Sequence, residues 1–142
     1  MHKIFGIKEN VAYTTRIGAY IIPVKDNKIG VIKTSKGYFL IGGGKDENET
    51  DEQCIKRESL EETGYNIKIE KKLCSAELYT YHEKIGYFNP IQTYYVGKIN
   101  NQTQPPKETD HKLLWLNIEE IKDNMYVEMQ GWAIKQMLKG LE

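Results

Sequence analysis

The sequence lacks long hydrophobic runs and contains little cysteine. Its first residues, MHKIFGIKEN, have no apolar core of the length that a secretory signal needs, and no later stretch is apolar enough to span a membrane. The only cysteines are Cys54 and Cys74, which we expect to stay reduced. These absences argue against an exported or membrane-spanning protein and predict a cytoplasmic location.

The chain also lacks an excess of either charge. Lys plus Arg and Asp plus Glu each number 20, so the formal net charge is zero. A neutral balance gives no electrostatic reason to expect duplex nucleic acid or a membrane surface as a partner, although it leaves a single nucleotide open. The length of 142 residues predicts one domain, residues 1–142, with one sizeable core.

Strand and helix signals alternate along this domain. Runs rich in β-branched and aromatic residues predict strands at 14–24, 28–34, 38–41, 66–82 (broken near 71–72), 91–99 and 113–116. Helical spacing of apolar residues predicts a closing helix at 124–139, whose Met and Trp stripe we assign to the core. The polar stretch 100–110 reads as a loop. Interleaved strands and helices indicate a single α/β domain.

The most informative stretch is residues 42–65, GGGKDENETDEQCIKRESLEETGY. It divides into a glycine-rich loop and a helix over about 51–63, which Thr50 and Gln53 can begin with a capping box and Gly64 can end. Asn48 suits a left-handed turn in the loop. Cys54 on this helix is better explained as a small packing residue than as a nucleophile.

Glu58, Glu61 and Glu62 stand at i, i+3 and i+4 and share one helix face. Like charges at this spacing destabilise a helix by roughly 0.2–0.5 kcal/mol per pair. A hard divalent cation would offset that repulsion. A solvated surface face is the ordinary explanation of such a cluster taken alone. Arg57 lies beside the cluster and can pair with a carboxylate of the helix or with Glu49 of the loop.

Taken together, these pieces resemble the Nudix box, Gly-x5-Glu-x7-Arg-Glu-U-x-Glu-Glu-x-Gly-U, where U is bulky and apolar. Residues 43–65 carry every Gly, Glu and Arg of that pattern. Ser59 departs from it at the first U, which should weaken helix packing, and Tyr65 departs mildly at the second. The resemblance implies the Nudix fold, a mixed β-sheet sandwiched between α-helices (α/β/α). Only the box is specific to the family.

The resemblance also implies the chemistry, which is hydrolysis of a nucleoside diphosphate linked to another moiety, X. Mg²⁺ is the implied cofactor, with Mn²⁺ as a substitute, and it would neutralise the diphosphate and activate water. Glu58 and Glu62 resemble the principal metal ligands, and Glu61 would bind directly or through water. Glu58 is also a candidate for activating the water, a role that competes with metal binding. Arg57 would orient the carboxylates.

Several further assignments stay open at this point. A backbone carbonyl of Gly42 or Gly43 is a candidate metal ligand, where only a residue without a side chain fits. The additional carboxylate that many relatives recruit from a later loop is Asp110 or Glu108, and His111 is the alternative as a distal base.

The candidates for substrate binding are Arg16, which could reach a phosphate, and Tyr79 and Tyr81, which could stack on a nucleobase. Ordinary strand packing explains the tyrosines equally well.

The leading hypothesis is therefore a Mg²⁺-dependent hydrolase of a small nucleotide, with a nucleoside triphosphate as the first substrate to test. The alternatives are a Nudix-like binding or sensor module without hydrolysis and, less favoured, an isomerase of a diphosphate-bearing isoprenoid. The closing helix or the aromatic stretch could also pair two copies in a homodimer. The aromatic stretch is residues 79–95, with Tyr79, Tyr81, Tyr87, Phe88, Tyr94 and Tyr95.

Overall fold

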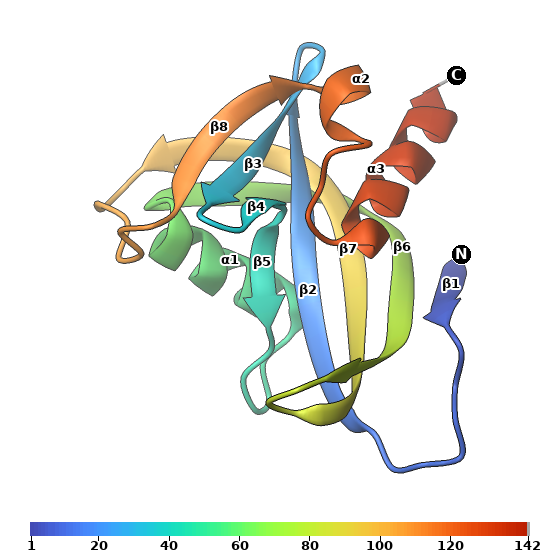
Figure 1. Ribbon diagram of the computed structural model, residues 1–142. Coiled ribbons are helices and arrows are strands. Elements are labelled where there is room, and N and C mark those ends of the chain that lie inside the picture. The colour runs from blue at the N-terminus through green and yellow to red at the C-terminus, as the bar shows by residue number, and fades with distance from the viewer. Residues whose placement is uncertain (142) are drawn as a thin grey trace.

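The computed structural model describes residues 1–141 and is built on a mixed β-sheet whose central strand is β2 (Figure 1). The strands in chain order are β1 (His2–Gly6), β2 (Thr14–Lys25), β3 (Lys28–Thr34), β4 (Gly37–Phe39), β5 (Ile41–Gly44), β6 (Tyr65–His82), β7 (Gly86–Gln102) and β8 (Lys112–Asn117). β2 pairs in parallel with β7 and antiparallel with β5. β6 runs antiparallel to β7 and carries β1 in parallel at the edge.

The end of β2 turns the chain into a smaller antiparallel sheet. Asp26 adopts a φ of 58° in the turn that leads to β3, and β3 pairs with β4 on one side and β8 on the other. β2 belongs to both sheets, because it pairs with the glycine-bearing β5 and, at its end, with β3. β3 in turn pairs with β8, the strand that follows the polar loop.

Helices cover both faces of the central sheet, which confirms the predicted α/β/α arrangement (Figure 1). They are α1 (Asp51–Glu62), the short α2 (Ile118–Ile121) and α3 (Glu128–Leu141). Successive strand residues point to opposite faces, so Ile21 packs in the cluster with Ile55 of α1 whereas Ile22 packs in the cluster with Ile134 of α3. None of the helices among residues 1–141 is long and apolar enough to cross a membrane.

The structure corrects four of the predicted element boundaries. The glycine-rich stretch that was expected to be a loop is the strand β5, because pairing with β2 supplies the hydrogen bonds of Gly42, Gly43 and Gly44. β6 is continuous, and shifts of register replace the break expected near 71–72. β7 extends beyond 91–99 at both ends. The closing helix begins at Glu128, because the preceding residues bridge back to Tyr38.

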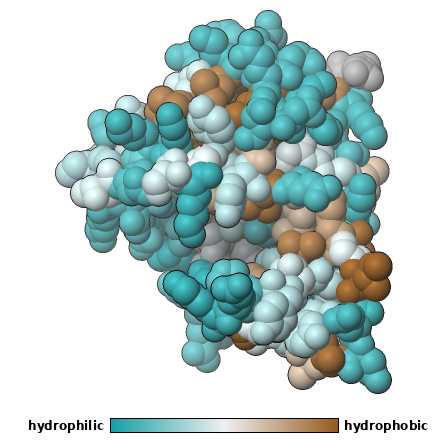
Figure 2. All heavy atoms as spheres, in the orientation of Figure 1, coloured by the Kyte–Doolittle hydropathy of each residue, from teal (hydrophilic) through white to brown (hydrophobic). Residues whose placement is uncertain are grey.

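Other local predictions are confirmed. Met129, Ala133 and Met137 of α3 are buried in the core, as the apolar stripe indicated. Ser59 is fully buried, and its hydroxyl donates to the carbonyl oxygen of Tyr65 at 2.8 Å. This bond ties the end of α1 to the start of β6. On the side of the molecule seen in Figure 1, the surface is mainly hydrophilic and its apolar residues form scattered patches (Figure 2).

Candidate active site

The acidic face of α1 is placed by the ends of the helix. The Thr50 hydroxyl accepts from the backbone N–H of Gln53 at 3.1 Å, and the Gln53 side chain accepts from the Thr50 N–H at 2.9 Å. This reciprocal pair is the predicted capping box. At the other end, Gly64 takes a φ of 77° and closes the helix. The two caps fix which residues of α1 face β5.

β5 allows Glu58 to approach the sheet closely. A Cβ atom at Gly43 would lie 2.6 Å from the carboxyl carbon of Glu58, closer than two carbon atoms can pack. The Glu58 carboxylate therefore lies directly against the backbone of β5. The Cys54 thiol donates to the Gly43 carbonyl oxygen at 3.3 Å and is fully buried, which agrees with its expected role as a packing residue.

Arg57 joins the loop to the acidic face. Its guanidinium donates to both carboxylate oxygens of Glu49, from Nε at 2.7 Å and from Nη2 at 2.9 Å. Nη1 donates to Glu58 at 2.8 Å and lies 3.5 Å from a carboxylate oxygen of Glu61. Nη2 also donates to the carbonyl oxygen of Gly44 at 3.0 Å. One cation thus positions the loop, the helix and β5 relative to one another, in the fork geometry that arginine provides.

The pKa values of Glu49 and Glu58, which both contact Arg57, are shifted in opposite directions. Hydrogen bonds from Arg57 lower the pKa of Glu49 to about 2, so Glu49 stays ionised. The pKa of Glu58 is raised because burial of its carboxylate outweighs the bonds from Arg57. Asn48 adopts a φ of 62°, which confirms the left-handed turn expected in the loop.

Glu62 is the most confined of these carboxylates. Its side chain is 8% exposed, and Oε1 accepts from the Gly42 N–H at 3.0 Å. Oε2 lies 3.3 Å from Nδ1 of His111, within ion-pair distance, although Nδ1 lacks the alignment of a hydrogen bond. Burial is the largest cause that raises the pKa of Glu62 to about 8, and the neighbouring Glu58 raises it further.

The donor chemistry of this face suits a hard divalent cation, because every side-chain donor is a carboxylate oxygen and two of the carboxyl groups have raised pKa values. As the side chains lie, no three His, Cys, Asp or Glu residues within 1–141 converge on one point. Arg57 holds Glu58 by a hydrogen bond and lies within ion-pair distance of Glu61.

The distal candidates reach different places. The Asp110 carboxylate accepts from the backbone N–H and the hydroxyl of Ser35, at 3.4 and 3.3 Å, and so caps the turn between β3 and β4. Glu108 is exposed, and its backbone N–H donates to the carbonyl oxygen of Glu61. His111 is the distal residue whose side chain lies against Glu62.

Asp110 and His111 border a cavity of about 400 Å³, which we call the box cavity. It is also lined by Tyr20, Phe39, Gly42 and Glu62. The box cavity therefore brings together the buried end of the acidic face and the loop that precedes β8.

A second cavity, of about 310 Å³, lies between β7 and α3, and we call it the α3-side slot. Its lining includes Arg16, Tyr20, Leu78, Phe88, Gln92 and Met129. Arg16 projects over Gly44 of β5 and has no ion-pair partner among residues 1–141. Its positive charge offsets part of the rise in the pKa of Glu58, so the guanidinium lies near the acidic face. Arg16 thus joins the α3-side slot to the box.

Tyr79 and Tyr81 lie away from both cavities. The Tyr79 ring packs edge-on against Tyr13 at 5.0 Å, and Tyr81, which is 62% exposed, packs against Tyr87 at 5.2 Å. Their side chains point to the face of the β6–β7 pair opposite Phe88, because strand residues alternate. The structure therefore does not bring Tyr79 and Tyr81 together with Arg16 and the box.

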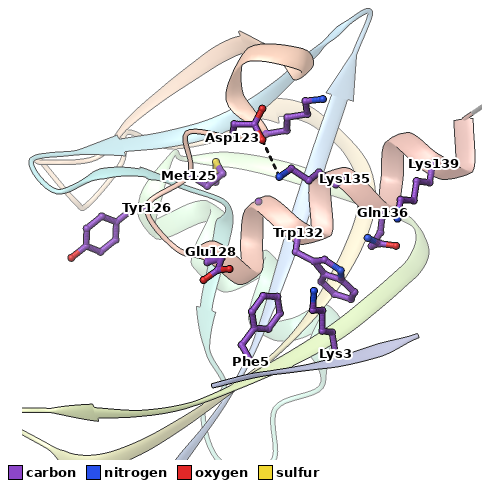
Figure 3. Close-up of a pocket in the computed structure, with 12 residues that line it drawn as sticks. Lys3, Phe5, Asp123, Met125, Tyr126, Glu128, Trp132, Lys135, Gln136 and Lys139 are labelled. Carbon is purple, nitrogen blue, oxygen red and sulfur yellow. Dashed lines mark ion pairs between the residues drawn. The ribbon is translucent and has the colours of Figure 1, made fainter. Parts of the chain in front are cut away.

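The hollow between β1 and α3 is separate from the box (Figure 3). It has a volume of about 520 Å³, and its walls include Phe5 and Trp132, whose rings meet edge-on at 6.0 Å. Lys135 on α3 is paired with Asp123 at 2.9 Å (Figure 3). None of the box glutamates lines this hollow.

Sequence reasoning did not select Tyr20 and Gln92, which line the α3-side slot, and it placed Phe88 only within the aromatic stretch. One signal was available, since Gln92 is a polar residue inside an apolar strand and is only 8% exposed. A buried amide must be hydrogen-bonded, which marks its surroundings as a polar network.

A sequence model of the NUDIX domain matches residues 14–136 of the chain. No curated protein matches it. Among solved structures the chain is similar to a NUDIX hydrolase from Nitrosomonas europaea, with a TM-score of 0.72 and 17% identity over 89% of this chain and 90% of that one. It is also similar to a MutT NUDIX hydrolase from Burkholderia pseudomallei, with a TM-score of 0.67, 21% identity and coverage of 87% and 98%.

A third similar structure is the NUDIX domain of Shewanella oneidensis NrtR complexed with ADP ribose. Its TM-score is 0.67 and its identity 18%, over 93% of this chain and 90% of that one. At these identities the likeness is one of fold.

Proposed function

This chain belongs to the Nudix family of hydrolases, and we propose that it cleaves the diphosphate linkage of a nucleoside triphosphate with Mg²⁺ bound to the acidic face of α1. Glu58 and Glu62 are the proposed principal ligands, with Glu61 assisting. The bound ion would neutralise the substrate diphosphate and activate the attacking water, and Mn²⁺ could replace it.

The observation that carries this proposal is the position of Glu58. Its carboxylate lies against Gly43 of β5, held by Arg57, on the same helix face as the buried Glu62. Burial raises the pKa of both carboxyl groups, so their charged forms gain from a cation. The adjacent carbonyl oxygens of Gly42 and Gly43 are proposed as further ligands.

The residues around this face have separable roles in the proposed reaction. Arg57 is a positioning residue, because it fixes Glu58 and Glu49 without facing either cavity. Arg16 binds a substrate phosphate, since its charge is unpaired and lies near Glu58. Two groups compete to accept the proton of the attacking water, Glu58 and His111, and the contact of His111 with Glu62 favours a role for that histidine over one for Asp110.

The direct test is release of phosphate and pyrophosphate from a panel of nucleoside triphosphates, with Mg²⁺ present and then chelated. Glu58→Gln should keep the fold and lower kcat/KM by about 100-fold or more. Glu52→Gln is the matched control, because Glu52 lies on the same helix, is exposed and pairs only with Lys56. Full turnover by Glu58→Gln would refute the assignment of Glu58.

Other outcomes would separate the remaining hypotheses. Turnover of a nucleotide sugar, a dinucleotide or a capped RNA end, but of no triphosphate, would keep the reaction and replace the substrate. Nucleotide binding without turnover of any member would favour the non-hydrolytic module. Isomerisation of isopentenyl diphosphate without phosphate release would favour the isomerase.

We also propose a cytoplasmic protein, since both cysteines are unpaired and buried, and a homodimer as its assembly. The exposed Tyr81 and Ile85 at the β6–β7 turn make the aromatic stretch the better interface, because the apolar residues of α3 are used in the core. Sedimentation that shows only monomer at high concentration would remove the dimer.

A further inference from the structure

The α3-side slot has the form of a pocket for a flat ring. Leu78, Phe88 and Met129 give it apolar walls, and its volume of about 310 Å³ is at the small end of the usual range of about 300–1,000 Å³ for ligand pockets. Arg16 is part of its lining and approaches Gly44, so the slot opens toward the proposed phosphate site. Aromatic and apolar walls suit the face of a nucleobase.

The polar end of the slot is Gln92, and a backbone group sets the orientation of its amide. The N–H of Leu40 can only donate, and it donates to Oε1 of Gln130 at 2.8 Å. Nε2 of Gln130 is therefore the group that faces Gln92, and it donates to Oε1 of Gln92 at 3.4 Å. The hydroxyl of Tyr94 donates to the same Oε1 at 2.7 Å. The acceptor of Gln92 is thus occupied by the protein.

The Gln92 amide therefore offers a ligand only N–H groups at this end of the slot, whereas the Tyr20 hydroxyl can both donate and accept. Nε2 of Gln92 lies 3.5 Å from the Tyr20 hydroxyl oxygen, a long contact that uses at most one of its two hydrogens. Burial raises the pKa of Tyr20, so the hydroxyl keeps its proton. Within residues 1–141 that proton has no acceptor. An amide N–H and a hydroxyl O–H are therefore both available beside the slot.

We propose that the α3-side slot receives the nucleobase and that Gln92 selects bases with a ring carbonyl over bases with an amino group at the same position. A carbonyl oxygen accepts from the free N–H of Gln92, whereas an amino group there would face that N–H with a donor of its own. This inference rests on the proposed function in one respect, namely that the substrate is a nucleotide.

Two pairs of nucleotides isolate this difference. Inosine and adenosine nucleotides differ chiefly in carrying a carbonyl or an amino group on the same carbon of the purine, and uridine and cytidine nucleotides provide the pyrimidine pair. Good hydrogen-bond pairing to a base edge is worth about 1–3 kcal/mol of discrimination. We therefore expect kcat/KM to favour ITP over ATP by about 10-fold to 100-fold, and UTP over CTP in the same direction.

The decisive variant is Gln92→Met, which keeps the length of the side chain and removes the donor. Its ITP-to-ATP ratio should fall to within about twofold of one, while thermal unfolding by circular dichroism reports whether it folds. Tyr94→Phe is the matched control, because Tyr94 bonds to the same amide but does not line the slot. It should keep the ratio, since Gln130 still holds the amide. If Gln92→Met does not fold, the wild-type preference for ITP over ATP and for IMP over AMP carries the test.

Binding of the monophosphates makes the test independent of turnover. Calorimetry should show tighter binding of IMP than of AMP to the wild type, and equal binding to Gln92→Met. That result without any hydrolysis would sink the proposed reaction and keep the role of Gln92. Hydrolysis of ITP and ATP at equal rates would support the proposed hydrolysis and refute base selection by Gln92. Equal binding of IMP and AMP, or binding of neither, overturns the proposal.

Discussion

The two faces of the central sheet treat buried polar groups in opposite ways. On the α1 side, Arg57 contacts the carboxylates of Glu58 and Glu61, and the pKa values of Glu58 and Glu62 are raised. On the α3 side, the buried polar atoms of Gln92 and Gln130 are neutral and hydrogen-bonded to the protein. One face is electrostatically loaded. The other, which we call the satisfied face, is neutral, and the amide oxygens of Gln92 and Gln130 both accept hydrogen bonds from the protein.

This difference suggests how each face would take part in binding. Binding of a cation stabilises the loaded face, because the carboxylates are already crowded in the folded protein and the cation relieves their repulsion. A network whose acceptors are occupied gains little from a further donor, but it holds its outward-facing N–H groups in one orientation for an acceptor. The α1 face is thus suited to binding charge and the α3 face to recognising shape and hydrogen-bonding pattern.

The largest expected effect comes from changing Arg57, the cation that contacts Glu58 and Glu61 on the loaded face. Arg57→Lys keeps the charge but cannot bond to both oxygens of Glu49 and also reach Glu58, so Glu58 should lose its fixed position. We expect kcat to fall by about 100-fold, the cost of a small misplacement of a catalytic group. Steady-state kinetics measure it, with Lys56→Gln on the exposed side of α1 as the control. Unchanged kcat would mean that Arg57 does not position Glu58.

The next effect concerns stability and tests the loaded face directly. The pKa of Glu62 is about 8 in the fold against an ordinary value of 4.5, so the folded state binds more protons than the unfolded state between these values. The free energy of unfolding should therefore fall as pH rises through that window and level off above about pH 8. Glu62→Gln removes this loss. In metal-free buffer at pH 9 the Glu62→Gln protein should be more stable than the wild type by a few kcal/mol. Each unit by which the pKa is shifted corresponds to about 1.4 kcal/mol.

Urea unfolding at pH 4 and pH 9 measures this difference. At pH 4 the variant and the wild type should be nearly equal, because Glu62 is protonated in both states of the wild type. Added Mg²⁺ should stabilise the wild type at pH 9 more than the variant if Glu62 is a ligand. A variant that is less stable than the wild type at pH 9 would show that the carboxylate is not under electrostatic load.

The matched change on the satisfied face should have the opposite sign. Gln130→Leu removes the acceptor of the Leu40 N–H and one of the two donors to Gln92, and Gln130 is 1% exposed. Unsatisfied buried groups cost about 1–3 kcal/mol each, so the free energy of unfolding should drop by about 2 kcal/mol. This loss should not change between pH 4 and pH 9, because the amide does not titrate. A stabilised Gln130→Leu protein would erase the contrast between the two faces.

The features that sequence predicted correctly are those set by neighbours along the chain. The caps of α1, the left-handed Asn48 and the shared face of Glu58 and Glu62 depend on residues within a few turns of one another. Such local rules do not need the rest of the fold. The roles assigned to these residues stay predictions.

The features that sequence could not supply depend on pairing between distant strands. Glycine is rare inside strands, so nothing in residues 42–44 indicated a strand until β2 was seen beside them. Asp110 and His111 are adjacent, and packing decides that one caps a turn while the other faces Glu62. The α3-side slot joins β2, β5, β6, β7 and the α3 side of the fold, which no local pattern records.

The smallest expected effect is on stability and comes from Ser59, near the end of α1. A bulky apolar residue is usual at this position of the Nudix box, yet the hydroxyl of Ser59 is buried and bonded to the Tyr65 carbonyl oxygen. Ser59→Ala should therefore destabilise the fold by about 1 kcal/mol, the usual net value of one hydrogen bond. Activity should be retained, because the acidic face is turned away from Ser59. If Ser59→Ala instead stabilises the protein in urea unfolding, apolar burial at this position outweighs the hydrogen bond to Tyr65.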